Sequence, residues 1–163
     1  MKTKLEAQSR IETPLGPLTL AATARGLALA WFDAQKHRTE EVDAPFRPEH
    51  PHLALAEREF EAYWRDTKSP FTVPLDAGGT EFQQAVWQAL RDIAPGTLST
   101  YGEVAQRIGK PAAVRAVGAA IGRNPIGIIV PCHRVVGRDG SLTGYAAGLP
   151  RKEALLKRER TTV

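Results

Sequence analysis

The alternation of apolar and polar positions divides the chain into a strand-rich first part and a helix-rich second part. Residues 9–32 predict a β-hairpin or short meander, with strands at residues 18–22 and 27–32. Residues 52–66 carry apolar side chains at helical spacing, and residues 71–75 predict a short edge strand because they include a proline. The expected fold class of the first part is therefore a small α/β domain, an antiparallel sheet plus a helix.

The Asp-Ala-Gly-Gly segment at residues 76–79 is the best candidate for a domain boundary, and it gives predicted domains of residues 1–78 and 79–163. No convincing chemical constellation precedes it, so we interpret the first domain as a structural scaffold. Three histidines lie in or beside a polar loop of this domain: His37, His50 and His52. Because their spacing matches no tight ligand pattern, we expect no metal site.

After the boundary the pattern becomes helical. A capping box at Thr80–Gln83 begins a predicted helix that ends near Ile93. A second capping box, at Thr100–Glu103, begins a short helix that ends near Ile108. The second domain is therefore expected to be mostly helical.

Gly109 and Pro111 separate this short helix from the next one, at residues 112–121, and the pair resembles a helix-turn-helix. One stripe of the later helix is expected to face the core: Val114, Val117 and Ile121. The opposite face is small apart from Arg115, the one side chain there that could reach a base. Such a helix would bind DNA with little sequence preference, in the minor groove with one inserted side chain. A small-residue helix packed within the core is the alternative.

The chain's single cysteine, Cys132, follows the apolar run of residues 126–130 and Pro131. The run predicts buried extended chain, which the proline ends. His133 and Arg134 come next, and nearby positive charge favours the reactive thiolate. From these residues a reactive thiol and a buried structural cysteine are about equally supported, because free cysteines are commonly buried.

The last predicted helix, residues 150–160, places an acid on its apolar side. Glu159 shares the face of Leu155 and Leu156, and an acid in such a place needs a partner. One available partner is His133, which would give a Cys–His–Glu relay. A surface glutamate at a fraying helix end is the alternative.

Composition and charge narrow the class of protein. The 163 residues are 42% hydrophobic and 25% charged, as in ordinary globular domains. No apolar run approaches the roughly 20 residues of a membrane span, and the start lacks a signal-peptide core, so we expect a cytoplasmic protein without a membrane partner. Residues 1–78 carry a net charge of −2 and residues 79–163 a net charge of +6, which makes the second domain the better site for a polyanion.

Four motifs carry a resemblance to a known family: Arg115-Ala-Val-Gly118, Asn124-Pro125, Ile129-Val-Pro-Cys-His-Arg-Val135, and Thr143-Gly-Tyr145 through Arg151-Lys-Glu153. Together they resemble the methylated-DNA–protein-cysteine methyltransferases, over roughly residues 80–160. The resemblance implies DNA repair by a single-turnover methyltransferase without a cofactor. The alkyl group of O6-methylguanine, with O4-methylthymine as an open second substrate, would pass irreversibly to Cys132 after base flipping.

The resemblance also implies residue roles. Cys132 would be the acceptor, His133 would take its proton through a bound water, and Glu159 would orient the histidine. Asn124 would bridge the turn to the cysteine, and Tyr101 would donate a hydrogen bond to the guanine. Arg115 would fill the gap left by the extruded base. The remaining positions implied at the pocket or the DNA are Gly102, Lys110, Gly118, Val135, Arg138, Tyr145 and Ala146.

By resemblance, the partner is double-stranded DNA that contains O6-alkylguanine, bound by a monomer through the minor groove, with cooperative clustering left open. Position 146 is alanine where some relatives carry a hydroxyl, and a single cysteine cannot form the zinc site of others. Two rival functions are a Cys–His hydrolase and a DNA-binding module in which Cys132 is only structural.

Overall fold

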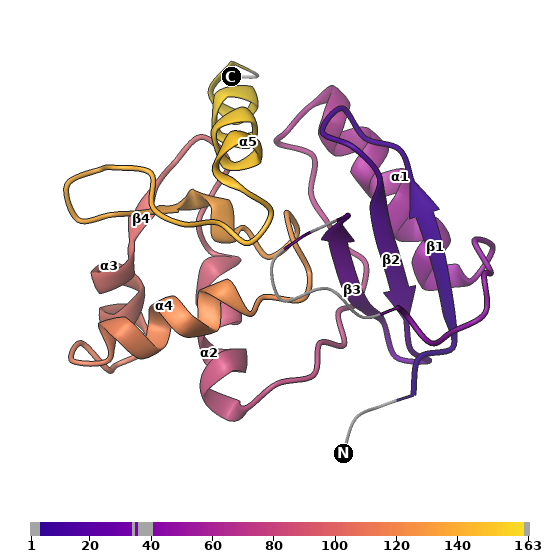
Figure 1. Ribbon diagram of the computed structural model, residues 1–163, viewed down its shortest axis with the longest axis horizontal. Helices are drawn as coiled ribbons and strands as arrows, with labels where there is room; N and C mark the ends of the chain where they lie inside the picture. Colours follow the sequence, from indigo (N-terminus) through magenta and orange to yellow (C-terminus); the bar gives the residue numbers. More distant parts are fainter. Residues whose placement is uncertain (1–3, 34, 36–40, 162–163) are drawn as a thin grey trace. The chain divides into compact units, whose positions relative to one another are not determined.

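The computed structural model describes residues 4–33, 35 and 41–161, and His37 lies outside these ranges. The chain divides into two compact units, Met1–Gly78 and Gly79–Val163 (Figure 1). Among the helices that the structure describes, none combines the length and the apolar character needed to cross a bilayer.

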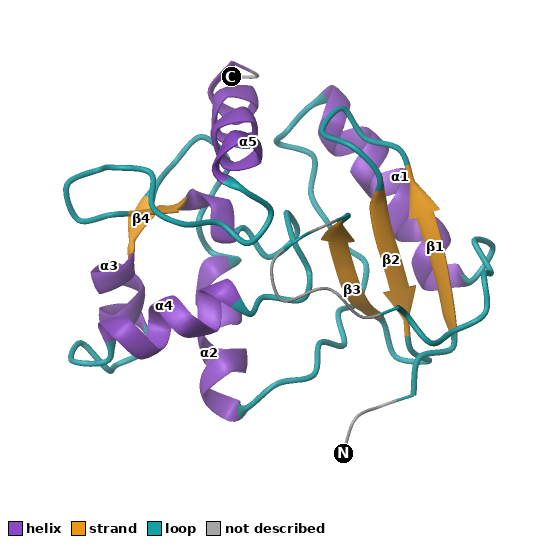
Figure 2. Ribbon diagram, in the orientation of Figure 1, coloured by secondary structure: helices purple, strands orange, loops and turns teal. Residues whose placement is uncertain are grey.

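The first unit is an antiparallel sheet with a helix packed against it. β1 (Ala7–Ile11), β2 (Leu18–Ala22) and β3 (Leu27–Phe32) lie in the order β1-β2-β3, and α1 (Pro51–Arg65) packs on the sheet (Figures 1 and 2). Fully buried side chains from strands and helix form the core: Leu18, Leu20, Leu27, Leu53, Phe60 and Tyr63. The predicted strands and the predicted helix are confirmed, because period-two and period-3.6 patterns report which face is buried.

The edge strand predicted at residues 71–75 is wrong. The described residues there show a single bridge, from Leu75 to Leu27. The buried carboxylate of Glu59, from α1, accepts the backbone N–H groups of Thr72 and Val73, each at 2.8 Å. Pro74 has no N–H to donate. A helix side chain therefore takes the donors that a strand would have offered to the sheet.

The second unit is mostly helical, as expected. Its elements in order are α2 (Glu81–Leu90), β4 (Ser99–Thr100), α3 (Tyr101–Arg107), α4 (Val114–Gly122), the 3-10 turn η1 (Cys132–Arg134), β5 (Val135–Val136) and α5 (Leu149–Thr161). β4 and β5 pair in parallel and join the start of α3 to the segment after η1. The Trp87 indole of α2 donates to the Ala120 carbonyl of α4 over 2.8 Å, which fixes the packing of these two helices.

The helix starts follow the predicted caps more closely than the helix ends follow the predicted stops. Thr80 and Gln83 form a reciprocal capping box, but α2 ends at Leu90, three residues before the predicted Ile93. Thr100 caps α3 through the Glu103 N–H, whereas the Glu103 carboxylate accepts from Ser99 Oγ. A cap involves neighbours in sequence, while a helix end depends on what the following chain packs against.

The helix-turn-helix is present as α3 and α4, with a different start for α4. Gly109 ends α3 with a φ of +76°, which glycine adopts without strain. Pro111 lies in the turn rather than in the first turn of α4, which begins at Val114 instead of residue 112. Val117 and Ile121 are buried as predicted, but Val114 is 40% exposed because it stands at the uncovered start of the helix.

We expect Glu59→Ala to destabilise the first unit by on the order of 3 kcal/mol. The change leaves the backbone N–H of the buried Val73 without an acceptor, and it removes the hydrogen bonds that Glu59 accepts from Thr72. Urea unfolding of the full chain would measure this effect. Glu61→Ala, an exposed change on the same helix, is the matched control and should lie within about 0.5 kcal/mol of the parent. Equal losses in both variants would contradict the role given to Glu59.

Candidate active site

Cys132 follows a tight turn rather than an extended strand. Residues 126–130 are buried apart from the half-buried Gly127, but Gly127 bridges Val130, and the Ile129 N–H donates to the Gly127 carbonyl over 2.8 Å. Ile128, between them, has a φ of +72°, which is rare and strained for a β-branched residue. The extended conformation predicted for this run is therefore wrong, although its burial was predicted correctly.

Asn124 holds this turn and reaches the thiol. Its side-chain oxygen accepts the Ile126 N–H at 3.0 Å, and its Nδ2 donates to the Val130 carbonyl at 2.9 Å and to Cys132 Sγ at 3.3 Å. The side chain thus supplies partners for backbone groups that a strand would pair with a neighbour. The expected bridge from the Asn-Pro turn to the cysteine segment is present in this geometry.

The thiol itself is nearly inaccessible, with 7% of the residue exposed. Burial raises the pKa of the Cys132 thiol, and the bond from Asn124, the charge of Lys152 and a bond from Tyr145 oppose that effect only in part. Desolvation disfavours the thiolate because a charge loses its hydration there. A base is therefore needed before this sulfur can act as a nucleophile.

His133 and Glu159 meet, although 26 positions separate them. His133 Nε2 lies 2.8 Å from Glu159 Oε2, and both side chains are fully buried. Burial works to raise the pKa of Glu159, but bonds from His133 and Arg134 and their charges outweigh it, so this pKa lies well below its usual range. The alternative of a frayed surface glutamate is excluded, since Glu159 is 2% exposed.

The ionisation of Glu159 determines the tautomer of His133. An ionised carboxylate only accepts hydrogen bonds, so Nε2 must carry the proton that it donates. The other ring nitrogen, Nδ1, is buried and makes no hydrogen bond to any residue that the structure describes. Burial also lowers the pKa of His133, more than the Glu159 carboxylate raises it. The ring is therefore neutral near pH 7, with its Nδ1 lone pair available to accept a proton.

Two further charged residues complete the site, and both were missed as site residues. Arg134 donates from Nε to Glu159 Oε1 at 2.9 Å and from Nη2 to Oε2 at 2.8 Å. Lys152 is 1% exposed and donates from Nζ to the Val135 carbonyl at 2.6 Å and the Thr143 carbonyl at 3.2 Å. Their signals were present in the sequence, as the cation after His133 and as the middle residue of Arg151-Lys-Glu153.

The tyrosines lie on two segments of the unit. Tyr101, the first residue of α3, shares a hydrogen bond of 2.7 Å between its Oη and Thr143 Oγ1. Tyr145 lies two residues beyond Thr143 and is half-buried, as is Ala146. Because Tyr145 also bonds the thiol, the loop from Thr143 to Ala146 links α3 to the cysteine.

The positions expected to face DNA fall into two groups. Three carry exposed cations: Lys110, Arg115 and Arg138. Gly102 and Gly118 are half-buried, and a Cβ at Gly118 would lie 3.8 Å from the Tyr101 ring. Val135 differs, because it is fully buried and presents no side chain to solvent. These six positions therefore offer three separate cations and no other side chain that could read bases.

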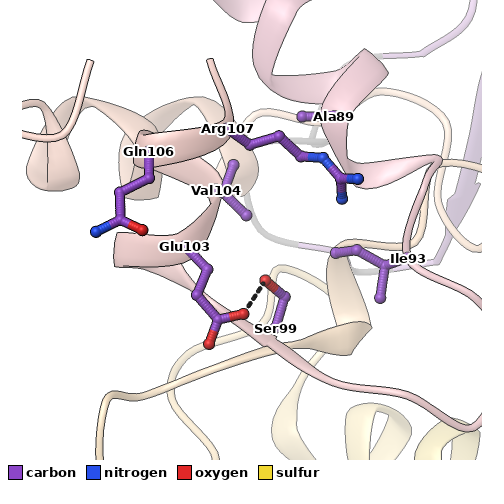
Figure 3. A pocket seen from close by; sticks show the side chains of 7 residues that line it. All are labelled: Ala89, Ile93, Ser99, Glu103, Val104, Gln106 and Arg107. Carbon is purple, nitrogen blue, oxygen red and sulfur yellow. Dashed lines mark hydrogen bonds between the residues drawn. The ribbon is translucent and has the colours of Figure 1, made fainter. Parts of the chain in front are cut away.

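A cavity of about 360 Å³ lies elsewhere in this unit, between the end of α2 and α3 (Figure 3). Its walls are Ala89, Ile93, Ser99, Glu103, Val104, Gln106 and Arg107. None of the site residues predicted from the sequence lines it. Within the described ranges, no three His, Cys, Asp or Glu side chains gather closely enough to hold a metal ion.

Family models match both parts of the chain. Residues 8–77 match the ribonuclease-like domain of 6-O-methylguanine DNA methyltransferase, and residues 81–161 match its DNA binding domain. The methylated-DNA–protein-cysteine methyltransferase of Methanosarcina acetivorans is 49% identical over 148 residues, which cover 91% of this chain and 94% of that protein. The corresponding protein of Mycobacterium tuberculosis is 45% identical, covering 93% of this chain and 90% of that protein.

Solved structures agree with this assignment. The crystal structure of Mycobacterium tuberculosis OGT in complex with DNA matches with a TM-score of 0.88 and 43% identity, covering 96% of this chain and 94% of that one. The O6-methylguanine-DNA methyltransferase of Pyrococcus kodakaraensis matches with a TM-score of 0.60 and 25% identity, covering 93% and 98%. The chain belongs to the 6-O-methylguanine DNA methyltransferase family.

Proposed function

We propose that this protein repairs DNA by transferring the alkyl group of O6-methylguanine directly and irreversibly to Cys132. The observation that carries the proposal is a buried thiol, bonded by Asn124 and followed in sequence by His133, whose buried Nδ1 has no hydrogen-bond partner among the described residues. Membership of the family and the likeness to a relative solved with DNA support the substrate class. A Cys–His hydrolase is a weaker explanation of this geometry, because the chain belongs to a family of methyltransferases.

The proposed chemistry is one displacement at carbon. His133 Nδ1 takes the thiol proton through a bridging water, since the ring makes no direct bond to the sulfur. The ionised Glu159 stabilises the imidazolium that forms. Sulfur then attacks the alkyl carbon, the carbon–oxygen bond breaks, and guanine leaves with the electron pair and regains a proton. Tyr101 supplies a hydrogen bond to the base as negative charge develops.

The product explains why transfer happens once. A thioether is a poor leaving group, and the chain has no second cysteine that could displace the alkyl group. The protein is thus a stoichiometric reagent as well as an enzyme. We propose a cytoplasmic location, because a thiol that must stay reduced until it is used suits a reducing compartment.

DNA binding is assigned to residues 79–163, and residues 1–78 are assigned a scaffold role. The exposed face of α4 carries Arg115 among small residues, which allows close approach to the minor groove and supports one inserted side chain. Gly102 and Gly118 carry no side chain that would keep DNA away from the backbone near Tyr101. Lys110 and Arg138 are suited to bind the phosphate groups of DNA. Tyr145, Ala146 and the Val135 segment would line the pocket for the extruded base. We propose that a monomer binds, with little sequence preference.

Incubation with a duplex that contains O6-methylguanine should add one methyl group to the peptide that carries Cys132. Mass spectrometry of the digested protein measures the addition, at no more than one group per chain. Cys132→Ser should bind the duplex but gain no methyl group. Repeated turnover would favour a hydrolase, and an unmodified parent protein with intact binding would favour a DNA-binding module with a structural cysteine.

Arg115→Ala should slow repair of duplex DNA by on the order of 10- to 100-fold and leave the reaction with free O6-benzylguanine nearly unchanged, because only the duplex requires base extrusion at a cost of a few kcal/mol. Single-turnover rates with the two substrates measure the difference. Arg160→Ala is the control: it removes one exposed positive charge from α5, as Arg115→Ala does from α4, and it should affect both rates little. Equal losses on both substrates in Arg115→Ala would rule out the inserted-residue role.

A further inference from the structure

The guanidinium of Arg134 joins three segments of the second unit. It forms a two-bond fork with Glu159 of α5, at 2.9 and 2.8 Å, and its Nη1 donates to the carbonyl of Ile93 after α2. Arg134 itself belongs to η1, directly after His133. Only 7% of the residue is exposed, so the pair has little help from solvent. A fork of this kind fixes the plane of the carboxylate as well as its place.

Glu159 Oε2 is shared between two donors. His133 Nε2 and Arg134 Nη2 each lie 2.8 Å from it. An arginine in a protein remains protonated, so its permanent charge offsets that of the carboxylate. The attraction of this anion for a second proton on His133 is therefore partly offset before the reaction starts.

Of the charged groups that face His133, two oppose the protonation of its ring and one, Glu159, favours it. Arg134 contributes a positive charge from η1, and Lys152 contributes another from α5. Glu159, also from α5, is the negative charge. The neighbouring Cys132 is uncharged as a thiol. Burial is the largest cause that lowers the pKa of His133, and the two cations add to it by opposing the attraction of Glu159 for a second proton.

We propose that Arg134 is a positioning residue for alkyl transfer: by holding Glu159 in a two-bond fork, it fixes the His133 proton on Nε2 and keeps Nδ1 free to receive the thiol proton. The inference rests on the proposed function, and it adds the residue that determines the protonation state of the general base. The hydrogen bonds of Arg134 go to Glu159 and to the Ile93 carbonyl, so Arg134 acts on the thiol through Glu159 and His133.

The charges around His133 determine in which direction its pKa should shift when Arg134 is replaced. Without the arginine charge, Glu159 attracts a proton to His133 more strongly, so the pKa of His133 rises. Alkyl transfer needs the neutral His133 ring, so the transfer rate reaches its plateau above the pKa of His133 and falls below that pKa. In Arg134→Met the acidic limb of the pH–rate profile should therefore move upward by about one pH unit or more.

The test measures single-turnover alkylation by free O6-benzylguanine from pH 5 to pH 9, which avoids any effect on DNA binding. Arg134→Lys keeps the charge and loses the fork, so its limb should stay within about 0.3 pH units of the parent, with a lower plateau rate. The double variant Arg134→Met/Glu159→Gln removes both charges and should return the limb to the parent position or below it. A uniform drop in rate, with no movement of the limb in Arg134→Met, would overturn the proposal.

A second measurement does not depend on alkyl transfer. Titration of the His133 ring nitrogens by ¹⁵N NMR should show the Nε2-protonated tautomer in the parent and an upward shift of its pKa in Arg134→Met. If Arg134→Met does not fold, the Arg134→Lys variant and the parent tautomer still decide the matter, since an Nδ1-protonated parent ring would contradict the inference. If the parent accepts no alkyl group, the proposed function fails while this titration still tests Arg134.

Discussion

The buried carboxylate of Glu159 is the interaction on which the site depends. It accepts from His133 and from both sides of the Arg134 fork, and thereby fastens α5 to the turn that carries the thiol. Burying the side chains of His133, Arg134 and Glu159 together costs free energy unless each has a hydrogen-bond partner with good geometry. Here the cost is offset by charge-assisted bonds, and the result is a histidine with a defined tautomer beside Cys132.

The same burial that organises the site works against the thiolate. A thiol that is 7% exposed has a raised pKa, and Asn124, Lys152 and Tyr145 recover only part of the loss. For a protein that reacts once, this balance has a physical advantage. A neutral thiol reacts slowly with oxidants and with small electrophiles, whereas a substrate placed against the sulfur can use the proton acceptor at His133.

Short-range features of the fold could be predicted from the sequence, and the errors have a common cause. Periodicity and neighbours within four residues account for the strands at residues 18–22 and 27–32, the Thr80 cap and the helix-turn-helix. The strand expected at residues 71–75 does not form because Glu59, 13 and 14 positions before Thr72 and Val73, accepts their backbone N–H groups. The run at residues 126–130 fails because Asn124 supports a strained turn at Ile128. In each case a side-chain carboxylate or amide outcompeted backbone pairing.

The sequence by itself determined that one cysteine follows a buried run, that a histidine adjoins it, and that an acid lies on the apolar side of the last helix. Only the tertiary structure decided that Glu159 meets His133 and shares its oxygen with Arg134, and therefore which ring nitrogen carries the proton. Sequence patterns report the energies of residues close along the chain. A contact across 25 positions depends on how η1 and α5 pack, and that packing is a property of the whole unit.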